Sequence, residues 1–72
     1  MKLAYAVVFE WAGTNYSAYV HDLPGCTSTG KSFDEVQKDI QEAIEGHIVL
    51  MRDTGEPVPE PTTKVGSVEV AA

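Results

Sequence analysis

The first eleven residues are apolar at nearly every position. Residues 2–11 are rich in β-branched and aromatic side chains, which favour extended backbone, so we predict a strand there. One face of this strand carries Leu3, Tyr5, Val7, Phe9 and Trp11. The other carries Ala4, Ala6 and Val8, as far as Glu10. A strand that is apolar on both faces usually lies inside a sheet with both faces covered. One helix can cover one face. The second face therefore predicts that copies of the chain associate. The alternative is that this face stays exposed to solvent, which its alanines tolerate.

Two turns divide the next part of the chain into short strands. Residues 12–15 contain glycine and asparagine and predict a hairpin turn, after which residues 16–21 return as a second strand. The second turn is the motif Asp22, Leu23, Pro24, Gly25 and Cys26. Its proline presets the first corner, and its glycine can take the positive φ of a type II turn. Residues 26–29 then predict a short third strand.

Residues 33–52 have the periodicity of a helix. Ser32 is a good N-cap, and Glu35, three residues later, completes a capping-box pattern. Apolar residues and one histidine recur at the three- and four-residue spacing of one helix face, at Phe33, Val36, Ile40, Ala43, Ile44, His47 and Met51. Near the end, residues 48–50 widen this apolar stripe, so we expect the last turns to contact more than the sheet. Gly55 suits the position just after the helix.

The remainder of the chain predicts an extended spacer and a last strand. Three alternate prolines stiffen residues 55–61, and residues 62–70 contain three valines of a weak strand. We therefore expect an α+β fold with the order β-β-β-α-β. Three antiparallel strands come first, then one long helix, then a fourth strand. The four strands form a mixed sheet, and the helix lies on one face of it. The last strand is expected to pair parallel with the first, which is the most apolar.

The size of the chain indicates that it needs a partner. A chain of 72 residues and 7.8 kDa allows one domain, residues 1–72. By size scaling it exposes roughly 4,400 Å² when folded, which makes a lone monomer marginal. Chains this small rely on disulfides, a metal or a partner. One cysteine excludes an internal disulfide, and Cys26, His21 and His47 lack zinc-ligand spacing. We expect no cofactor and no metal.

The charge of the chain narrows the class of partner. Eleven acidic and five basic residues give a net charge of −6. Such a surface repels phosphates, so direct binding of DNA or RNA is not expected, and a basic protein partner suits it better. No apolar run approaches the length of a membrane span, and no cleavage site follows the N-terminal apolar stretch. We expect no membrane association and a cytoplasmic location.

Four local patterns occur together in this chain. They are the aromatic-rich first hairpin, the turn at residues 22–26, the helix opening at residues 30–35 and the proline spacer at residues 55–61. This set and its spacing resemble the HicB family of antitoxins, in their N-terminal domain. The resemblance covers nearly the whole chain. In place of the alanine that often follows the helix-opening glutamate in the family, this chain has Val36.

The resemblance implies a partly degraded ribonuclease-H-like fold. It also implies binding to a small basic toxin of the HicA type, an mRNA interferase whose active surface the antitoxin covers. Family members commonly form dimers or tetramers, and many carry a C-terminal DNA-binding segment. This sequence ends at Ala72, directly after the expected last strand, so we expect no separate DNA-binding domain here.

Candidate catalytic groups are sparse. Neighbouring residues on a strand point to opposite faces, so His21 and Asp22 are not expected to act as an acid–base pair. We interpret His47 as a packing residue and Cys26 as a small buried one. A ribonuclease-H-like nuclease needs several carboxylates around magnesium. The acids on expected strands or strand ends, Glu10, Asp22 and Glu69, form no evident cluster. We therefore expect no enzymatic activity.

The candidate contact residues combine aromatic, apolar and acidic side chains. Tryptophan and tyrosine are enriched at interface hot spots. The set comprises Trp11, Tyr16, Tyr19, Val8, Glu42 and Glu45. The two glutamates lie on the expected exposed face of the helix. The predicted function is neutralisation of a small basic toxin. The first alternative is a solitary self-assembling adaptor of the same fold. The second is a remnant nuclease.

Overall fold

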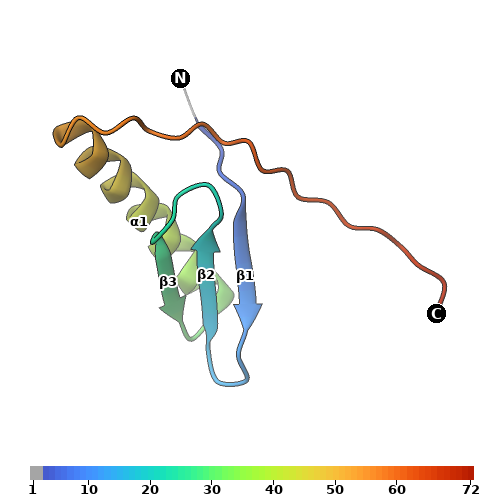
Figure 1. The fold of residues 1–72 in the computed structure, drawn as a ribbon. Helices are drawn as coiled ribbons and strands as arrows, with labels where there is room; N and C mark the ends of the chain where they lie inside the picture. The colour runs from blue at the N-terminus through green and yellow to red at the C-terminus, as the bar shows by residue number, and fades with distance from the viewer. Residues whose placement is uncertain (1–2) are drawn as a thin grey trace.

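The structure, a computed structural model that describes residues 3–72, contains three strands followed by one helix (Figure 1). The strands are β1 (Val7–Trp11), β2 (Tyr16–Val20) and β3 (Thr27–Gly30), and the helix is α1 (Phe33–Asp53). The first four predicted elements are thus confirmed, each with slightly different bounds. The first strand begins at Val7 rather than at residue 2, and residue 2 lies outside the described residues.

The three strands form an antiparallel sheet in the order β1-β2-β3. Val7 lies opposite Val20, and Trp11 lies opposite Tyr16. The sheet therefore has β2 at its centre and β1 at one edge, whereas the apolar pattern had predicted an interior position for β1. Residues 54–72 form no strand in the structure. The α+β class and the three antiparallel strands are confirmed, and the fourth strand stays a prediction.

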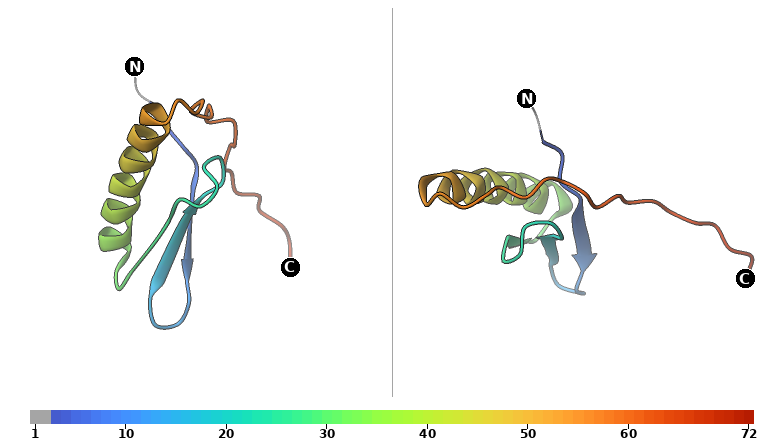
Figure 2. Two further views of the ribbon diagram at one scale, coloured as in Figure 1. Left: turned by 60° about the vertical axis from the view of Figure 1, so that its left-hand side comes forward. Right: turned by 45° about the horizontal axis from the view of Figure 1, so that its top comes forward.

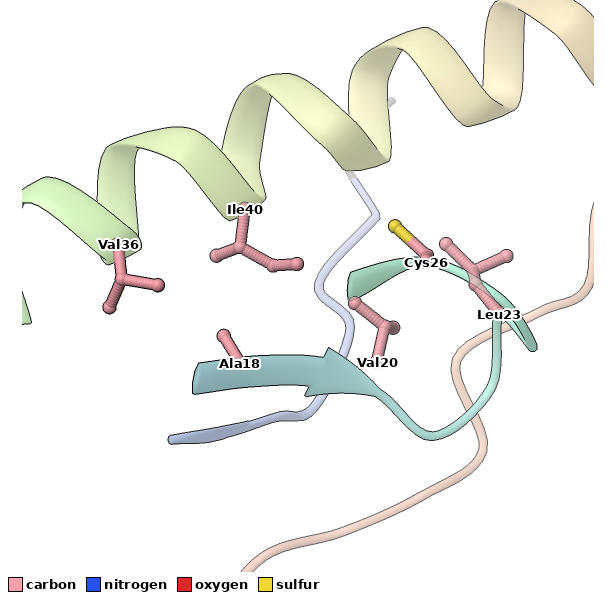
Figure 3. Packing of buried hydrophobic residues seen from close by; sticks show 6 residues of the cluster. All are labelled: Ala18, Val20, Leu23, Cys26, Val36 and Ile40. Atoms are coloured by element: carbon pink, nitrogen blue, oxygen red, sulfur yellow. The ribbon is translucent and has the colours of Figure 1, made fainter. Parts of the chain in front are cut away.

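The core lies between α1 and one face of the sheet. In Figure 2, α1 forms a separate layer beside the strands, and it packs mainly over β2 and β3. Figure 3 shows α1 directing two apolar side chains toward β2, with the turn after β2 closing one end of the cluster. The buried residues are Ala18, Val20, Leu23, Cys26, Val36 and Ile40. Full burial of a side chain such as Leu23 contributes about 1.5–3 kcal/mol.

Local hydrogen bonds explain where α1 begins and ends. The Ser32 side chain accepts a hydrogen bond from the backbone N–H of Glu35 at 3.1 Å, which confirms the predicted N-cap. The Glu35 carboxylate accepts one from the backbone N–H of Lys31, also at 3.1 Å. The helix ends at Asp53 with Thr54 as its C-cap, and Gly55 follows with a φ of 76°. That left-handed conformation favours glycine after a helix.

The segment after α1 crosses the end of the sheet and is held there by side chains. The Tyr5 hydroxyl donates to the carbonyl of Pro59. The Asp22 carboxylate accepts from the backbone N–H groups of Thr62 and Thr63 at 3.1 and 3.0 Å. Beyond this point the chain extends away from the sheet to its C-terminus (Figure 1). We call residues 64–72 the tail.

Candidate partner-binding surface

An open groove runs between β1 and α1. It exists because α1 packs over β2 and β3 and leaves the inner face of β1 only partly covered. One side of the groove is formed by β1 and the residues before it, with Leu3, Tyr5, Val7 and Phe9. The helix side consists of Gln37, Ile40, Gln41, Ile44, Glu45, Ile48, Val49 and Arg52. The groove is therefore apolar along its floor, with polar and charged side chains from the helix.

Sequence reasoning missed most of this groove as a surface. The pattern on residues 2–11 predicted an uncovered apolar face, but assigned it to the face of the strand that carries Val8. The structure leaves the Val8 face without a helix layer, and it also leaves the opposite face, with Val7 and Phe9, partly uncovered. One signal did point to the helix side, because residues 48–50 widened the apolar stripe. Val49 and Leu50 are 57% and 60% exposed, so the further contact expected for these last turns stays a prediction.

Aromatic side chains cluster where the β1–β2 hairpin meets the start of α1. The rings of Trp11 and Tyr16 lie 4.8 Å apart between centroids, and those of Tyr16 and Phe33 lie 6.0 Å apart. The ring centroids of Phe9 and Phe33 lie 4.7 Å apart, with the rings tilted by 57°. These spacings are in the range of favourable aromatic pairs. Trp11 remains 56% exposed, so this cluster offers a large apolar side chain to a partner.

The other predicted contact residues lie on two further surfaces. Val8 and Tyr19 face each other across β1 and β2. They point away from α1, because their neighbours Ala18 and Val20 are buried beneath it. Glu42 and Glu45 are exposed on α1, and Glu45 also lines the groove. The six predicted residues thus fall on three separate surfaces, and their role in binding stays a prediction.

The turn at residues 22–26 also anchors the segment before the tail. Besides the two backbone bonds, the Asp22 carboxylate accepts from the Thr63 hydroxyl at 2.7 Å and from the Thr62 hydroxyl at 3.4 Å. The hydrogen bonds from Thr63 and Thr62 lower the pKa of Asp22 below its usual range. The motif predicted a turn, and Gly25 has the expected positive φ, 85°. The anchoring role was not visible in the sequence, because Thr62 follows forty residues later.

The remaining candidate chemical groups are dispersed. Cys26 is buried, as predicted, and burial raises the pKa of its thiol. Glu10 lies on β1, Asp22 in the turn and Glu69 in the tail. Within residues 3–72, histidine, cysteine and acidic side chains nowhere gather in the groups of three that could hold a metal ion. Nor does the described chain contain a helix with the length and apolar content required to cross a membrane.

A small α+β domain with an open apolar groove, an exposed tryptophan and acidic positions on its helix is typical of a protein-binding module. Comparison with known proteins identifies the family. Residues 5–70 match the model of the HicB-like antitoxins of bacterial toxin–antitoxin systems. The chain therefore belongs to the HicB-like antitoxin family, which confirms the resemblance drawn from the sequence.

A curated relative supports the same assignment over part of the chain. A UPF0150 protein of Helicobacter pylori is 47% identical over 38 residues. That alignment covers 53% of this chain and 53% of the relative, so it spans about half of each protein. No solved structure matches the chain.

Proposed function

We propose that this protein is an antitoxin that neutralises a small basic mRNA-interferase toxin of the HicA type by direct contact. The observation that carries the proposal is the family match, which extends over residues 5–70. The proposed partner belongs to the toxin class that the family resemblance implies. The protein itself contributes binding and no catalysis.

Charge supports a basic partner. An mRNA interferase must hold phosphates on a basic surface, and the antitoxin has a net charge of −6. Helix α1 carries several of the exposed acidic side chains, including Glu42 and Glu45. A partner of opposite charge gains association rate from electrostatic steering. Occupation of the basic surface would at the same time exclude RNA from the toxin.

The proposed contact surface combines the acidic positions of α1 with the exposed aromatic residue Trp11. Aromatic side chains supply binding energy in desolvated contacts, and charged residues at the rim mainly supply rate and specificity. Val8, Tyr16 and Tyr19 are proposed as further contact residues, either for the toxin or for a second copy of the chain. The working form is proposed to be a cytoplasmic homo-oligomer, a dimer or tetramer, with a partly degraded ribonuclease-H-like fold. Direct contact with DNA is not part of this proposal.

Capture of the native partner tests the function first. The tagged full chain is purified from lysate of its own host, and the co-purifying proteins are identified by intact mass. We expect a stoichiometric basic protein that arrests growth when expressed alone and cleaves mRNA. Adding the antitoxin should abolish that cleavage. A captured partner that is neither toxic nor basic would contradict the proposal.

Charge reversal then tests the contact surface. The double variant Glu42→Lys/Glu45→Lys should associate with the captured toxin about tenfold more slowly at low salt, since steering is lost. The matched control is Glu56→Lys/Glu60→Lys, which changes the net charge equally but lies in the proline segment. Equal slowing by both variants would show that only the overall charge matters, and would remove α1 from the proposed surface.

The open groove favours a second candidate function. An apolar groove and an edge strand within one small domain also suit a self-assembling adaptor of the same fold without a toxin. The same capture experiment separates the two functions. Recovery of this chain alone, at a fixed copy number, would support the adaptor and exclude the antitoxin role in that host.

A further inference from the structure

Strand β1 has an unpaired edge that lacks the usual protection. Within residues 3–72, β1 pairs with β2 alone, so the backbone groups on its other side are available to another strand. Edge strands normally discourage such pairing by lysine, proline or a bulge. The segment Val7–Trp11 contains none of these residues, and its only charge is Glu10. This edge is therefore a template for strand addition.

The tail has the composition of a strand but makes no such pairing. Val65, Val68 and Val70 are 75%, 87% and 82% exposed. Within the described residues, the tail has no secondary structure, and Thr63, just before it, is the last residue with a side-chain or turn hydrogen bond to the rest of the fold. β-branched residues favour sheet positions, where their side chains pack. The structure thus contains both an unpaired strand edge and an unpaired strand-like segment.

The segment before the tail determines where the tail starts. Tyr5 holds Pro59, and Asp22 holds Thr62 and Thr63, at the end of the sheet where β1 begins. Alternate prolines stiffen the connection from α1. From this fixed point the tail diverges from β1 of its own chain and runs outward, as Figures 1 and 2 show. A tail with this exit direction is placed to reach a neighbouring molecule.

We propose that the tail of one copy forms a strand on the unpaired edge of β1 in a second copy, and that two copies exchange their tails reciprocally. The tail strand would run along the rim of the groove and place Val68 and Val70 against its apolar wall. The exchange specifies how the proposed homo-oligomer forms, and it does not require toxin binding.

Lengths and areas are consistent with a stable exchange. Nine extended residues span about 30 Å and the five residues of β1 about 17 Å, so the tail is long enough to pair along the whole strand. The single chain exposes 5668 Å², whereas a compact protein of its mass exposes roughly 4,400 Å². The tail itself has about 1,200 Å² of surface by extended-chain scaling. We take half of that area as buried on each of the two tails, and an equal area as buried on the two receiving edges. The total buried area is then about 2,400 Å², above the size of a standard stable interface.

Symmetry makes the exchange a closed dimer. Each copy donates one tail and receives one, so both β1 edges are occupied and no unpaired copy of this edge is left for growth into a fibre. Exchange of an identical element between protomers is a low-cost route to dimers. The inference therefore predicts a dimer of defined mass rather than a distribution of larger species.

The first test is the mass of the purified antitoxin alone, by native mass spectrometry and light scattering. We expect twice the 7.8 kDa chain mass. The variant Val68→Asp/Val70→Asp should fall to the mass of one chain, with the helical circular dichroism of α1 retained. The matched control Ser67→Asp/Ala71→Asp adds the same charge on the alternate positions of the tail and should remain dimeric.

Hydrogen exchange distinguishes a tail paired between copies from one paired within a chain. In the dimer, the amides of residues 65–70 should be protected, and the Val68→Asp/Val70→Asp variant should lose both this protection and the dimer. A monomer with a protected tail would overturn the inference in favour of a fourth strand on the same chain. A dimer that persists in that variant, or an unprotected tail in the wild type, would overturn it as well. None of these outcomes depends on whether a toxin binds.

Discussion

At the scale of single residues, Asp22 contributes most to joining distant parts of the chain. Its carboxylate lies in the turn after β2 and accepts four hydrogen bonds from Thr62 and Thr63. Hydrogen bonds to the charged form of a carboxylate favour that form. Ionised Asp22 therefore holds the start of the tail more strongly than protonated Asp22 does.

The sign of the pH dependence follows from the lowered pKa of Asp22. Because the folded pKa lies below the unfolded value of about 3.9, the stabilisation is present above that value and is lost as the pH falls through the folded pKa. We expect the Thr62 and Thr63 amide resonances to move toward random-coil positions below about pH 4. NMR titration measures this change.

The variant Asp22→Asn provides the control for this titration. An uncharged amide keeps an oxygen acceptor but does not titrate in this range. The acid transition of the Thr62 and Thr63 resonances should therefore disappear in the variant. Persistence of the same transition would assign it to another group and contradict the role given to Asp22.

At the scale of elements, α1 combines good ends with one weak interior position. Ser32 and Gly55 define its two ends, and Val36 and Ile40 bury its inner face. Gly46 lies within the helix, and a Cβ atom added there would meet nothing within 4 Å. Glycine in a helix interior costs conformational entropy without benefit to packing here.

Substitution of this glycine should stabilise the protein. Gly46→Ala is expected to raise the free energy of unfolding by about 0.5–1 kcal/mol, because alanine has the higher helix propensity. Urea denaturation followed by circular dichroism measures the change. The contrasting variant is Gly30→Ala, whose Cβ would lie 3.3 Å from the backbone nitrogen of Val36. It should destabilise the protein, and a gain in both variants would contradict this account of the helix packing.

At the scale of the whole molecule, the placement of α1 decides which surfaces remain available for assembly. The helix covers β2 and β3, so the groove beside β1 and the aromatic cluster at the hairpin stay open to partners. A chain of 72 residues gains little from burying its own core alone. Further stabilisation is therefore expected to come from association.

Truncation of the exposed tryptophan should separate assembly from folding. Trp11→Ala is expected to weaken association of the protein, with itself or with the proposed toxin, more than it reduces secondary structure. The reason is that the side chain is half exposed and lies beside Tyr16 at the end of the hairpin. Solution mass, toxin binding and circular dichroism are measured together. Lost helicity with unchanged mass and binding would contradict a contact role for Trp11.

The sequence by itself determined the local elements and the family of this protein. Alternation and turn residues predicted the three strands, and the three- and four-residue spacing with Ser32 predicted α1. These features depend on neighbours within a few positions, so they can be read along the chain. The quoted motifs likewise led to the HicB-like family, which the match over residues 5–70 shows.

Only the tertiary structure decided how the elements meet. The apolar pattern of residues 2–11 could not show that α1 lies over β2 and β3, which leaves β1 at an edge beside a groove. Nor could the sequence show that Asp22 binds Thr62 and Thr63 and so fixes the point from which the tail leaves the sheet. These features depend on the relative position of residues far apart in the chain. Such contacts are set by packing of the whole molecule, whereas local periodicity reports only which face of an element is apolar.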